Sequence, residues 1–242
     1  MITDEEQKRY ARQILLSGEE GQERLKAASV LVAGAGGLGT VISLYLAAAG
    51  VGRLRIIDCD IVESSNLNRQ ILHWSRDVGR PKTASVKEKL AALNPLIRIE
   101  AEQSRITEEN MGALAQGCNL IVDAMDNFPT RYLLNRTAVD RGIPFIHGAV
   151  RGFFGQTTTV IPGKGPCLRC LFPVSPPPEV FPIVGATCGV IGSIEAAEAI
   201  KLLTGQGEPL MGRIFIWDGL AGNADSIIVE RNPACPDCGN LP

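Results

Sequence analysis

The chain has 242 residues, which is enough for one sizeable domain or two small ones. Hydrophobic residues make up 45% and charged residues 21%, as is usual for a protein with a buried core. The formal net charge of −2 provides no broad basic field, so neither nucleic acid nor an anionic membrane is expected as a partner. The first residues, MITDEEQKRYARQ, are charged from Asp4 onward and lack an apolar signal-peptide core, so we expect a cytoplasmic protein.

Residues 4–27 are predicted to form a helical arm that is broken by Gly18 and Gly21. The charge-free stretch 27–52 is long enough to span a bilayer, but the glycines near its start favour a strand, a glycine loop and an apolar helix. Strands and helices then alternate, with strands expected at 29–32, 54–57, 97–101, 120–124 and 145–147 and helices at 38–49, 82–93, 108–116 and 130–141.

This alternation predicts an α/β fold of the Rossmann-like, doubly wound type, with a mostly parallel sheet covered on both faces. A proline-rich stretch at 172–182 is incompatible with a helix. A helix at 192–205 and strands at 213–217 and 226–230 follow. We therefore expect the sheet to continue into a partly antiparallel C-terminal portion.

The string GAGGLG fits the pattern G-x-G-x-x-G between the first predicted strand and helix, with glycines at 34, 36, 37 and 39. Glycine lets backbone N–H groups approach phosphate oxygens closely at the positive end of a helix. Asp58 follows the next strand, where a carboxylate can accept hydrogen bonds from a ribose. These residues favour nucleotide binding over a purely structural glycine turn, but they do not separate NAD from ATP.

Three charged residues make ATP the better interpretation. Arg69 and Lys82 offer cations for a triphosphate, and Asp126 follows an apolar strand at the edge where it could hold Mg²⁺. Each one taken alone could be an ordinary solvated surface charge. Their common placement after strands or in loops favours a triphosphate over a dinucleotide.

Four of the seven cysteines form two C-x-x-C pairs, at Cys167 and Cys170 and at Cys235 and Cys238. Together they can supply the four thiolates of a tetrahedral zinc site that staples two distant segments. A redox C-x-x-C and two independent disulfides are the alternatives. The flanking prolines and glycines favour metal knuckles over a thioredoxin-like helix start.

Several strings together make the sequence recognisable: RYARQ at 9–13, GAGGLG at 34–39, DCDIVESSNLNRQ at 58–70, GRPK at 79–82, DAMDN at 123–127, the paired C-x-x-C motifs and GVIGSIEAAEAIKLLTG at 189–205. They resemble the ThiF/MoeB/HesA family, the bacterial relatives of ubiquitin-activating enzymes. The resemblance implies an adenylyltransferase that uses Mg·ATP to activate the C-terminal Gly-Gly carboxylate of a ubiquitin-like sulfur carrier and releases pyrophosphate. The pathway, whether molybdopterin, thiamine or a related one, stays open.

The resemblance also implies roles for individual residues. Catalysis is expected from Arg69, Lys82, Asp126 and an Arg12 that reaches the γ-phosphate from a partner subunit, which implies a homodimer. The expected nucleotide contacts are Gly34, Gly36, Gly37, Gly39, Asp58, Asp60, Asn66, Arg69, Lys82, Asp126 and Asn127. The attacking carboxylate is already ionised at neutral pH, so no base is needed, and His73 and His147 are expected to be structural.

The zinc at Cys167, Cys170, Cys235 and Cys238 is expected to be structural. We expect a single domain over 1–242, composed of a helical arm at 1–27, a nucleotide-binding half at 28–160 and a zinc-stapled carrier-binding half at 161–242. The chain stops shortly after Cys238 without a rhodanese module, so a separate protein is expected to donate sulfur.

Cys188 admits two interpretations. Family members that link covalently to their carrier use a cysteine in the loop after the first C-x-x-C, and this chain has a proline near 178 at that place. Either Cys188 packs in the core of an enzyme that only adenylates, or it acts as the nucleophile from a shifted loop with its pKa lowered by a helix N-terminus. We favour the first.

Three other functions remain as alternatives. Adenylation of a peptide carboxylate in natural-product biosynthesis would keep the chemistry and change the substrate. An NAD(P)-dependent oxidoreductase would explain the glycine loop and Asp58, but not Arg69, Lys82, Asp126 or the cysteines. A catalytically silent scaffold that binds a carrier would not need those charged residues at all.

Overall fold

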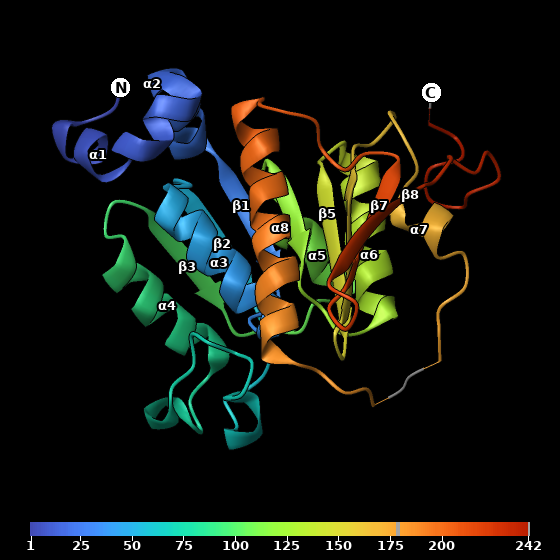
Figure 1. The fold of residues 1–242 in the computed structure, drawn as a ribbon, viewed down its shortest axis with the longest axis horizontal. Coiled ribbons are helices and arrows are strands. Elements are labelled where there is room, and N and C mark those ends of the chain that lie inside the picture. Colours follow the sequence, from blue (N-terminus) through green and yellow to red (C-terminus); the bar gives the residue numbers. More distant parts are fainter. Residues whose placement is uncertain (178–179, 242) are drawn as a thin grey trace.

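The computed structural model describes residues 1–177 and 180–241, so the proline near 178 lies outside the described residues. Its arm consists of α1 (Asp4–Arg9) and α2 (Ala11–Ala27), which lead into the sheet (Figure 1). The Thr3 side chain accepts the Glu6 N–H, and the Glu6 carboxylate accepts the Thr3 N–H, which closes a capping box on α1. Gly18 kinks α2 at a φ of 69°, as expected, whereas Gly21 lies buried inside the helix and does not break it.

The core of the molecule is one eight-stranded sheet with the order β3-β2-β1-β4-β5-β6-β7-β8. The first five strands pair in parallel and the last three pair antiparallel, as the sequence predicts. The strands are β1 (Ser29–Ala33), β2 (Arg53–Ile57), β3 (Arg98–Glu102), β4 (Leu120–Asp123), β5 (Phe145–Arg151), β6 (Phe154–Val160), β7 (Arg213–Asp218) and β8 (Asn223–Ile228).

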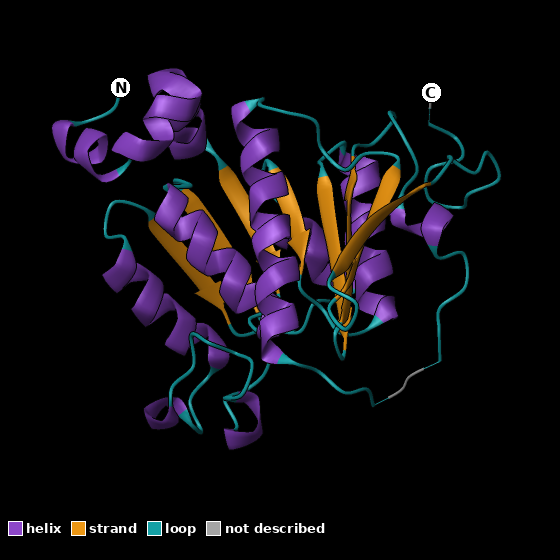
Figure 2. Ribbon diagram, viewed as in Figure 1, coloured by secondary structure: helices purple, strands orange, loops and turns teal. Residues whose placement is uncertain are grey.

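Helices cover both faces of this sheet (Figures 1 and 2). Helices α3 and α8 pack against each other on one face, and α5 and α6 lie on the other. The bounds are α3 (Gly37–Ala49), α4 (Lys82–Leu93), α5 (Glu108–Leu114), α6 (Phe128–Arg141), α7 (Leu168–Leu171) and α8 (Gly185–Thr204), with 3₁₀ turns η1 (Ser64–Asn66) and η2 (Ser75–Asp77).

Strand β1 shows no alternation of polar and apolar residues because both of its faces are buried. Val30 and Val32 pack toward α3 and α8, whereas Leu31 and Ala33 pack toward the opposite core cluster. Both faces are covered, so all four side chains are fully buried. The charge-free stretch 27–52 thus becomes β1, the glycine loop and α3, and no described helix has the length and apolarity to cross a bilayer.

The largest departures from the expected elements lie in the C-terminal half. Helix α8 begins at Gly185 rather than at 192, so Cys188 lies within the helix and not before it. The strand predicted at 226–230 lies earlier, at Asn223–Ile228, and all six of its residues are exposed. A fully exposed edge strand has no buried face to fix its limits in the sequence. Strand β6, with its run of threonines, was not anticipated.

Gly39 provides a test of the close packing between α3 and the glycine loop. A Cβ at this position would lie 2.0 Å from the Gly34 carbonyl oxygen. The backbone around Gly34 would have to move to make room for this Cβ. We therefore expect Gly39→Ala to lower the free energy of unfolding by about 2 kcal/mol. Gly189 in α8 is the matched control, since a Cβ there meets no atom within 4 Å. Urea unfolding of both variants checks this, and an unchanged Gly39→Ala midpoint would contradict the packing argument.

Candidate active site

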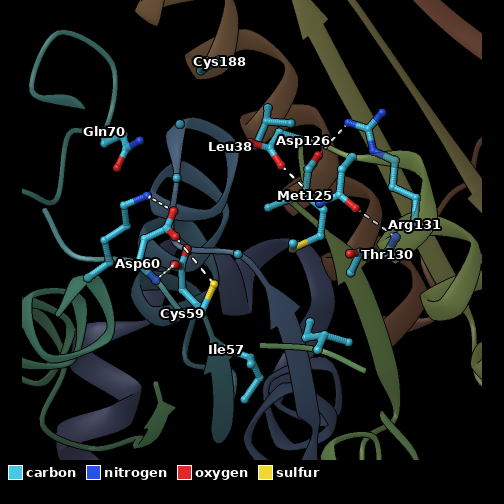
Figure 3. A pocket seen from close by; sticks show the side chains of 18 of the residues that line it. Leu38, Ile57, Cys59, Asp60, Gln70, Met125, Asp126, Thr130, Arg131 and Cys188 are labelled. Carbon is cyan, nitrogen blue, oxygen red and sulfur yellow. Dashed lines mark hydrogen bonds and ion pairs between the residues drawn. The ribbon is translucent and has the colours of Figure 1, made fainter. Parts of the chain in front are cut away.

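A pocket of about 280 Å³ opens at the carboxyl ends of β1, β2 and β4 (Figure 3). The strand order reverses at β1, since β2 lies on one side of it and β4 on the other. The connections after β1 and β4 therefore leave toward opposite faces of the sheet, and ligands of such sheets bind in the crevice between them. Glycines of the loop form one wall, and residues after β4 form the other.

The glycines at the pocket have separate reasons to lack a side chain. Gly34 has a φ of 108°, and a Cβ there would lie 2.6 Å from the Ala124 carbonyl oxygen. Gly36 is the N-cap of α3 without a side-chain cap, so first-turn amides remain available for an anion. Gly34, Gly36 and Gly37 line the pocket, whereas Gly39 does not and serves helix packing.

Asp58 closes the glycine loop against β2. One carboxylate oxygen accepts the Ala35 N–H at 2.7 Å, and the other accepts the Asp60 N–H at 2.8 Å. Each oxygen keeps a second lone pair, and the residue lines the pocket. The Asp58 carboxylate can therefore hold the loop and still accept a hydroxyl of a bound sugar.

Lys82 and Arg69 bring positive charge to the same pocket. The Lys82 ammonium lies 2.8 Å from an oxygen of Asp60 and is only 8% exposed, whereas Asp60 is 61% exposed. This ion pair lowers the pKa of Asp60 below its ordinary value. Arg69 donates to the Ser65 carbonyl at 2.9 Å and to the Asn68 side chain at 3.0 Å. A bound polyphosphate would compete with these oxygens for both cations.

The opposite wall carries Asp126, which follows β4 (Figure 3). Asn127 is the N-cap of α6 and accepts the Thr130 N–H at 3.0 Å, while its amide donates to Asp126 at 3.2 Å. Within the described part of the chain, Asp126 is exposed and forms no ion pair. An exposed carboxylate without a cation, on the wall facing two cations, fits the oxygen ligand that Mg²⁺ prefers.

Besides Gly39, two other expected residues lie outside the pocket lining. Asn66 is buried in η1, where its side-chain oxygen accepts the Glu63 N–H at 3.1 Å. Arg12 is exposed on α2, which leads into the amino end of β1, whereas the pocket lies at the carboxyl end of that strand. Arg12 therefore cannot complete the pocket of its own chain.

Sequence reasoning missed much of the remaining lining. Residues 104–106 follow β3, so the rule that ligands bind at carboxyl edges could have indicated them. Five more lie within the strings GAGGLG, DCDIVESSNLNRQ and DAMDN, so those strings could have indicated them, whereas the rest depend on tertiary packing. The additional lining residues are Leu38, Ile57, Cys59, Gln70, Ser104, Arg105, Ile106, Ala124, Met125, Thr130, Arg131, Val150, Phe181, Ile183 and Cys188.

Cys188 faces the underside of the glycine loop. It is 1% exposed, and a Cβ on Gly37 would lie 2.8 Å from its sulfur. Burial raises the pKa of the Cys188 thiol to about 11, although the charge of Arg69 opposes this shift. The nucleophile hypothesis requires a helix N-terminus to lower the pKa of the Cys188 thiol, whereas the net shift is upward. The packing favours the structural interpretation of Cys188.

The four cysteines of the C-x-x-C pairs lie together, with their sulfur atoms within 4.8 Å of one another. Cys167 and Cys235 approach to 3.6 Å between sulfurs, and Cys170 and Cys238 to 3.4 Å. A tetrahedron with zinc–sulfur bonds of about 2.3 Å has edges of about 3.8 Å. The sulfur spacing therefore fits one metal ion, and it exceeds the ~2 Å of a disulfide.

Both histidines are buried and engaged by protein groups. His147 contacts a carboxylate oxygen of Asp123 at 2.7 Å through Nδ1. His73 contacts the Ser85 hydroxyl and the Ala35 carbonyl, each at 2.9 Å. Burial lowers the pKa of both imidazoles, so neither carries charge at neutral pH. These contacts agree with a structural role.

Residues 10–237 match the model of the ThiF family. The chain belongs to the ThiF family. Among its relatives, the sulfur carrier protein adenylyltransferase of Thermus thermophilus is 48% identical, over 99% of this chain and 93% of that protein. The SAMP-activating enzyme E1 of Haloferax volcanii is 45% identical, over 96% of this chain and 88% of that protein.

Solved structures of a more distant protein share the fold. The crystal structure of E. coli MccB matches with a TM-score of 0.89 and 25% identity, over 98% of this chain and 74% of that chain. The crystal structure of E. coli MccB with ATP gives a TM-score of 0.88 at 25% identity, over 96% and 75%. The resemblance to the ThiF family and the α/β fold expected from the sequence are confirmed.

The buried thiol of Cys188 predicts slow alkylation. With a pKa of about 11, its thiolate fraction at pH 7.5 is very small and rises tenfold per pH unit up to that value. We expect exposed Cys59 to react with iodoacetamide first, and Cys188 to react only at much higher pH or after unfolding. Mass spectrometry of the peptides measures both rates. Faster reaction of Cys188 than of Cys59 at pH 7.5 would restore the nucleophile hypothesis.

Proposed function

We propose that this ThiF-family chain is an adenylyltransferase that activates the C-terminal Gly-Gly carboxylate of a ubiquitin-like sulfur-carrier protein with ATP. One observation carries the proposal: Arg69, Lys82 and Asp126 line a single pocket together with the glycine loop and Asp58. The glycine loop and the helix N-terminus largely satisfy the two phosphates of a dinucleotide, so two further cations and a carboxylate weigh against an NAD(P)-dependent oxidoreductase. Two relatives at 48% and 45% identity over nearly the whole chain are named as a sulfur carrier protein adenylyltransferase and a SAMP-activating enzyme E1, which supports this substrate class.

The residues suggest how the reaction is assisted. The carrier carboxylate attacks the α-phosphorus of ATP, a P–O bond forms to the carboxylate, and the bond to pyrophosphate breaks. Arg69 and Lys82 would stabilise the charge that develops on the leaving pyrophosphate, and loop amides would orient the phosphates. Asp126 would hold Mg²⁺, which supplies further positive charge to the phosphates. Positioning and electrostatics suffice because the nucleophile is already an anion.

The carrier is preferred to a peptide as the substrate. The MccB structures fit the alternative, adenylation of a peptide, but they are only 25% identical. The two relatives named above are far more similar and align over 93% and 88% of their own lengths. A catalytically silent scaffold is disfavoured by Lys82. Its ammonium is almost buried at the pocket, and burying a charge costs free energy that the fold alone does not require.

The remaining features of the proposal concern assembly. Arg12 lies away from its own pocket and would act on the γ-phosphate of a partner subunit in a homodimer. The chain would work as one domain in the cytoplasm, with residues 1–27 as the arm, 28–160 around the nucleotide and 161–242 toward the carrier. A separate protein would donate sulfur. The four cysteines would hold a structural zinc ion.

Pyrophosphate exchange into ATP tests the activity directly. Exchange should depend on a carrier that ends in Gly-Gly, and Asp126→Ala or Arg69→Ala should lower its rate by about 100-fold or more. Asp140→Ala on the exposed side of α6 is the matched control and should keep the rate of the wild type.

Exchange that depends on one carrier supports the proposal and names the pathway. ATP binding without exchange for any carrier would point to a peptide substrate instead. NADH binding together with no ATP binding would overturn the nucleotide assignment.

Metal removal tests the cysteine site. We expect about one zinc per chain by elemental analysis, and removal by a strong chelator should lower the melting temperature because the site joins two distant segments. Cys238→Ser should show the same loss, whereas Cys118→Ser, outside the cluster, should keep the metal. Less than about half an equivalent of metal in protein purified without chelator would contradict the assignment.

A further inference from the structure

A chain of buried hydrogen bonds runs from α4 to the glycine loop. The Lys89 ammonium contacts a carboxylate oxygen of Asp77 at 2.5 Å and donates to the Ser85 hydroxyl at 2.8 Å. The Ser85 hydroxyl lies 2.9 Å from Nδ1 of His73, and Nε2 of His73 lies 2.9 Å from the Ala35 carbonyl oxygen. All five residues are buried. The proposed reaction uses none of the four side chains, so their role needs another explanation.

The chemistry of the partners fixes the tautomer of His73. The Ala35 carbonyl can only accept, so Nε2 carries the proton. Nδ1 of the neutral ring then presents a lone pair and accepts the Ser85 O–H at 2.9 Å, in preference to the Leu72 carbonyl, which lies 3.4 Å from the same hydroxyl. Ser85 in turn accepts from Lys89, which can only donate. Donors and acceptors thus follow one direction, from the ammonium of Lys89 to the carbonyl of Ala35.

His73 and Asp58 hold Ala35 from two sides. The Ala35 N–H is bound by Asp58 at 2.7 Å, and the Ala35 carbonyl is bound by His73 at 2.9 Å. In a trans peptide the C=O and the following N–H point in opposite directions. A carbonyl fixed toward His73 therefore turns the N–H of Gly36 away from His73. Gly36 lines the pocket at the N-terminus of α3.

We propose that His73 is a positioning residue of the nucleotide site: as its Nε2–H tautomer it holds the Ala35 carbonyl and aims the Gly36 amide at a nucleotide phosphate. Positions 82, 85 and 89 share one face of α4, so a single helix sets both the ammonium of Lys82 and the His73 contact. This inference rests on the proposed function for the identity of the ligand. It assigns His73 no contact with that ligand, and His73 does not line the pocket.

The tautomer can be observed without any nucleotide. The sequence has two histidines, so ¹⁵N-histidine labelling of the whole protein gives two ring systems in a two-bond ¹H–¹⁵N spectrum. We expect His73 as the Nε2–H tautomer and His147, whose Nδ1 meets the Asp123 carboxylate, as the Nδ1–H tautomer. His73→Gln assigns the signals. A His73 ring protonated on Nδ1, or an equal mixture of tautomers, would overturn the inference.

ATP binding to the full-length protein gives the second readout. His73→Phe keeps the ring volume and removes both contacts, and we expect about tenfold weaker ATP binding, the factor that one hydrogen bond supplies. His73→Gln can still donate to Ala35 and should stay within about threefold of the wild type. Carrier affinity should not change in either variant, because the loop contact concerns only the nucleotide.

Ser85→Ala provides a milder variant if His73→Phe does not fold. It leaves His73 in place but removes the hydroxyl that orients the ring, and about threefold weaker ATP binding is expected. The matched control is Ser43→Ala in α3, since the Ser43 hydroxyl is equally buried and has no hydrogen-bond partner among the described residues. Ser43→Ala should bind ATP as the wild type does.

The outcomes separate this inference from the proposed function. If the wild type binds ATP and exchanges pyrophosphate while folded His73→Phe binds ATP equally well, the positioning role is wrong and the function stands. If His73→Gln is impaired as much as His73→Phe, the ring contributes packing rather than a hydrogen bond, and the inference also fails. If the wild type does not bind ATP, the proposed function fails, whereas the tautomer measurement still tests the contact with Ala35.

Discussion

The reversal of strand order at β1 is the constraint from which the rest of the site follows. Because β2 and β4 flank β1, the chain leaves β1 toward α3 on one face and leaves β4 toward α6 on the other. The two loops cannot close on each other, and a crevice remains between them. Because β1, β2 and β4 run parallel, Asp58, after β2, and Asp126, after β4, lie at the same edge of the sheet.

The two walls of the crevice are held in similar ways. On one wall the Ala35 peptide is fixed by Asp58 and His73. On the other wall the Met125 N–H donates to Asp123 at 2.9 Å, and its carbonyl accepts from Arg131 at 2.6 Å. In both cases a carboxylate at a strand end takes the N–H and a buried nitrogen donor takes the C=O. Backbone fixed in this way need not reorganise when charge develops in the pocket.

Features that depend on local chemistry were predictable from the sequence. The glycine loop, Asp58 after β2 and the spacing of the cysteines each follow from a local rule on turns, strand ends or metal knuckles. Lys82 and Asp126 could be placed because they follow strands or begin helices. The core helices were also visible, and Lys82–Leu93 was bounded as predicted because Asn94 and Pro95 stop it.

Features that depend on packing between distant segments were not predictable. The early start of α8 at Gly185 has no N-cap side chain to signal it. The capping role of Asn66 and the packing role of Gly39 depend on neighbours that only the fold supplies. Arg131 reaches the pocket from α6, and an arginine in a helix is ordinarily expected at the surface. The sequence therefore indicated the charged residues of the pocket, but not the residues that hold them and the backbone in position.

The contact between Gly37 and Cys188 has an evolutionary consequence. A Cβ at position 37 would lie 2.8 Å from the sulfur at position 188, closer than two such atoms can approach without a shift. The sizes of these two positions are therefore coupled, although they lie far apart in the chain. A larger residue at 37 becomes tolerable only after the residue at 188 has become smaller, so the order in which substitutions accumulate matters. We expect descendants of this sequence to carry a larger residue at position 37 only where position 188 holds a residue smaller than cysteine.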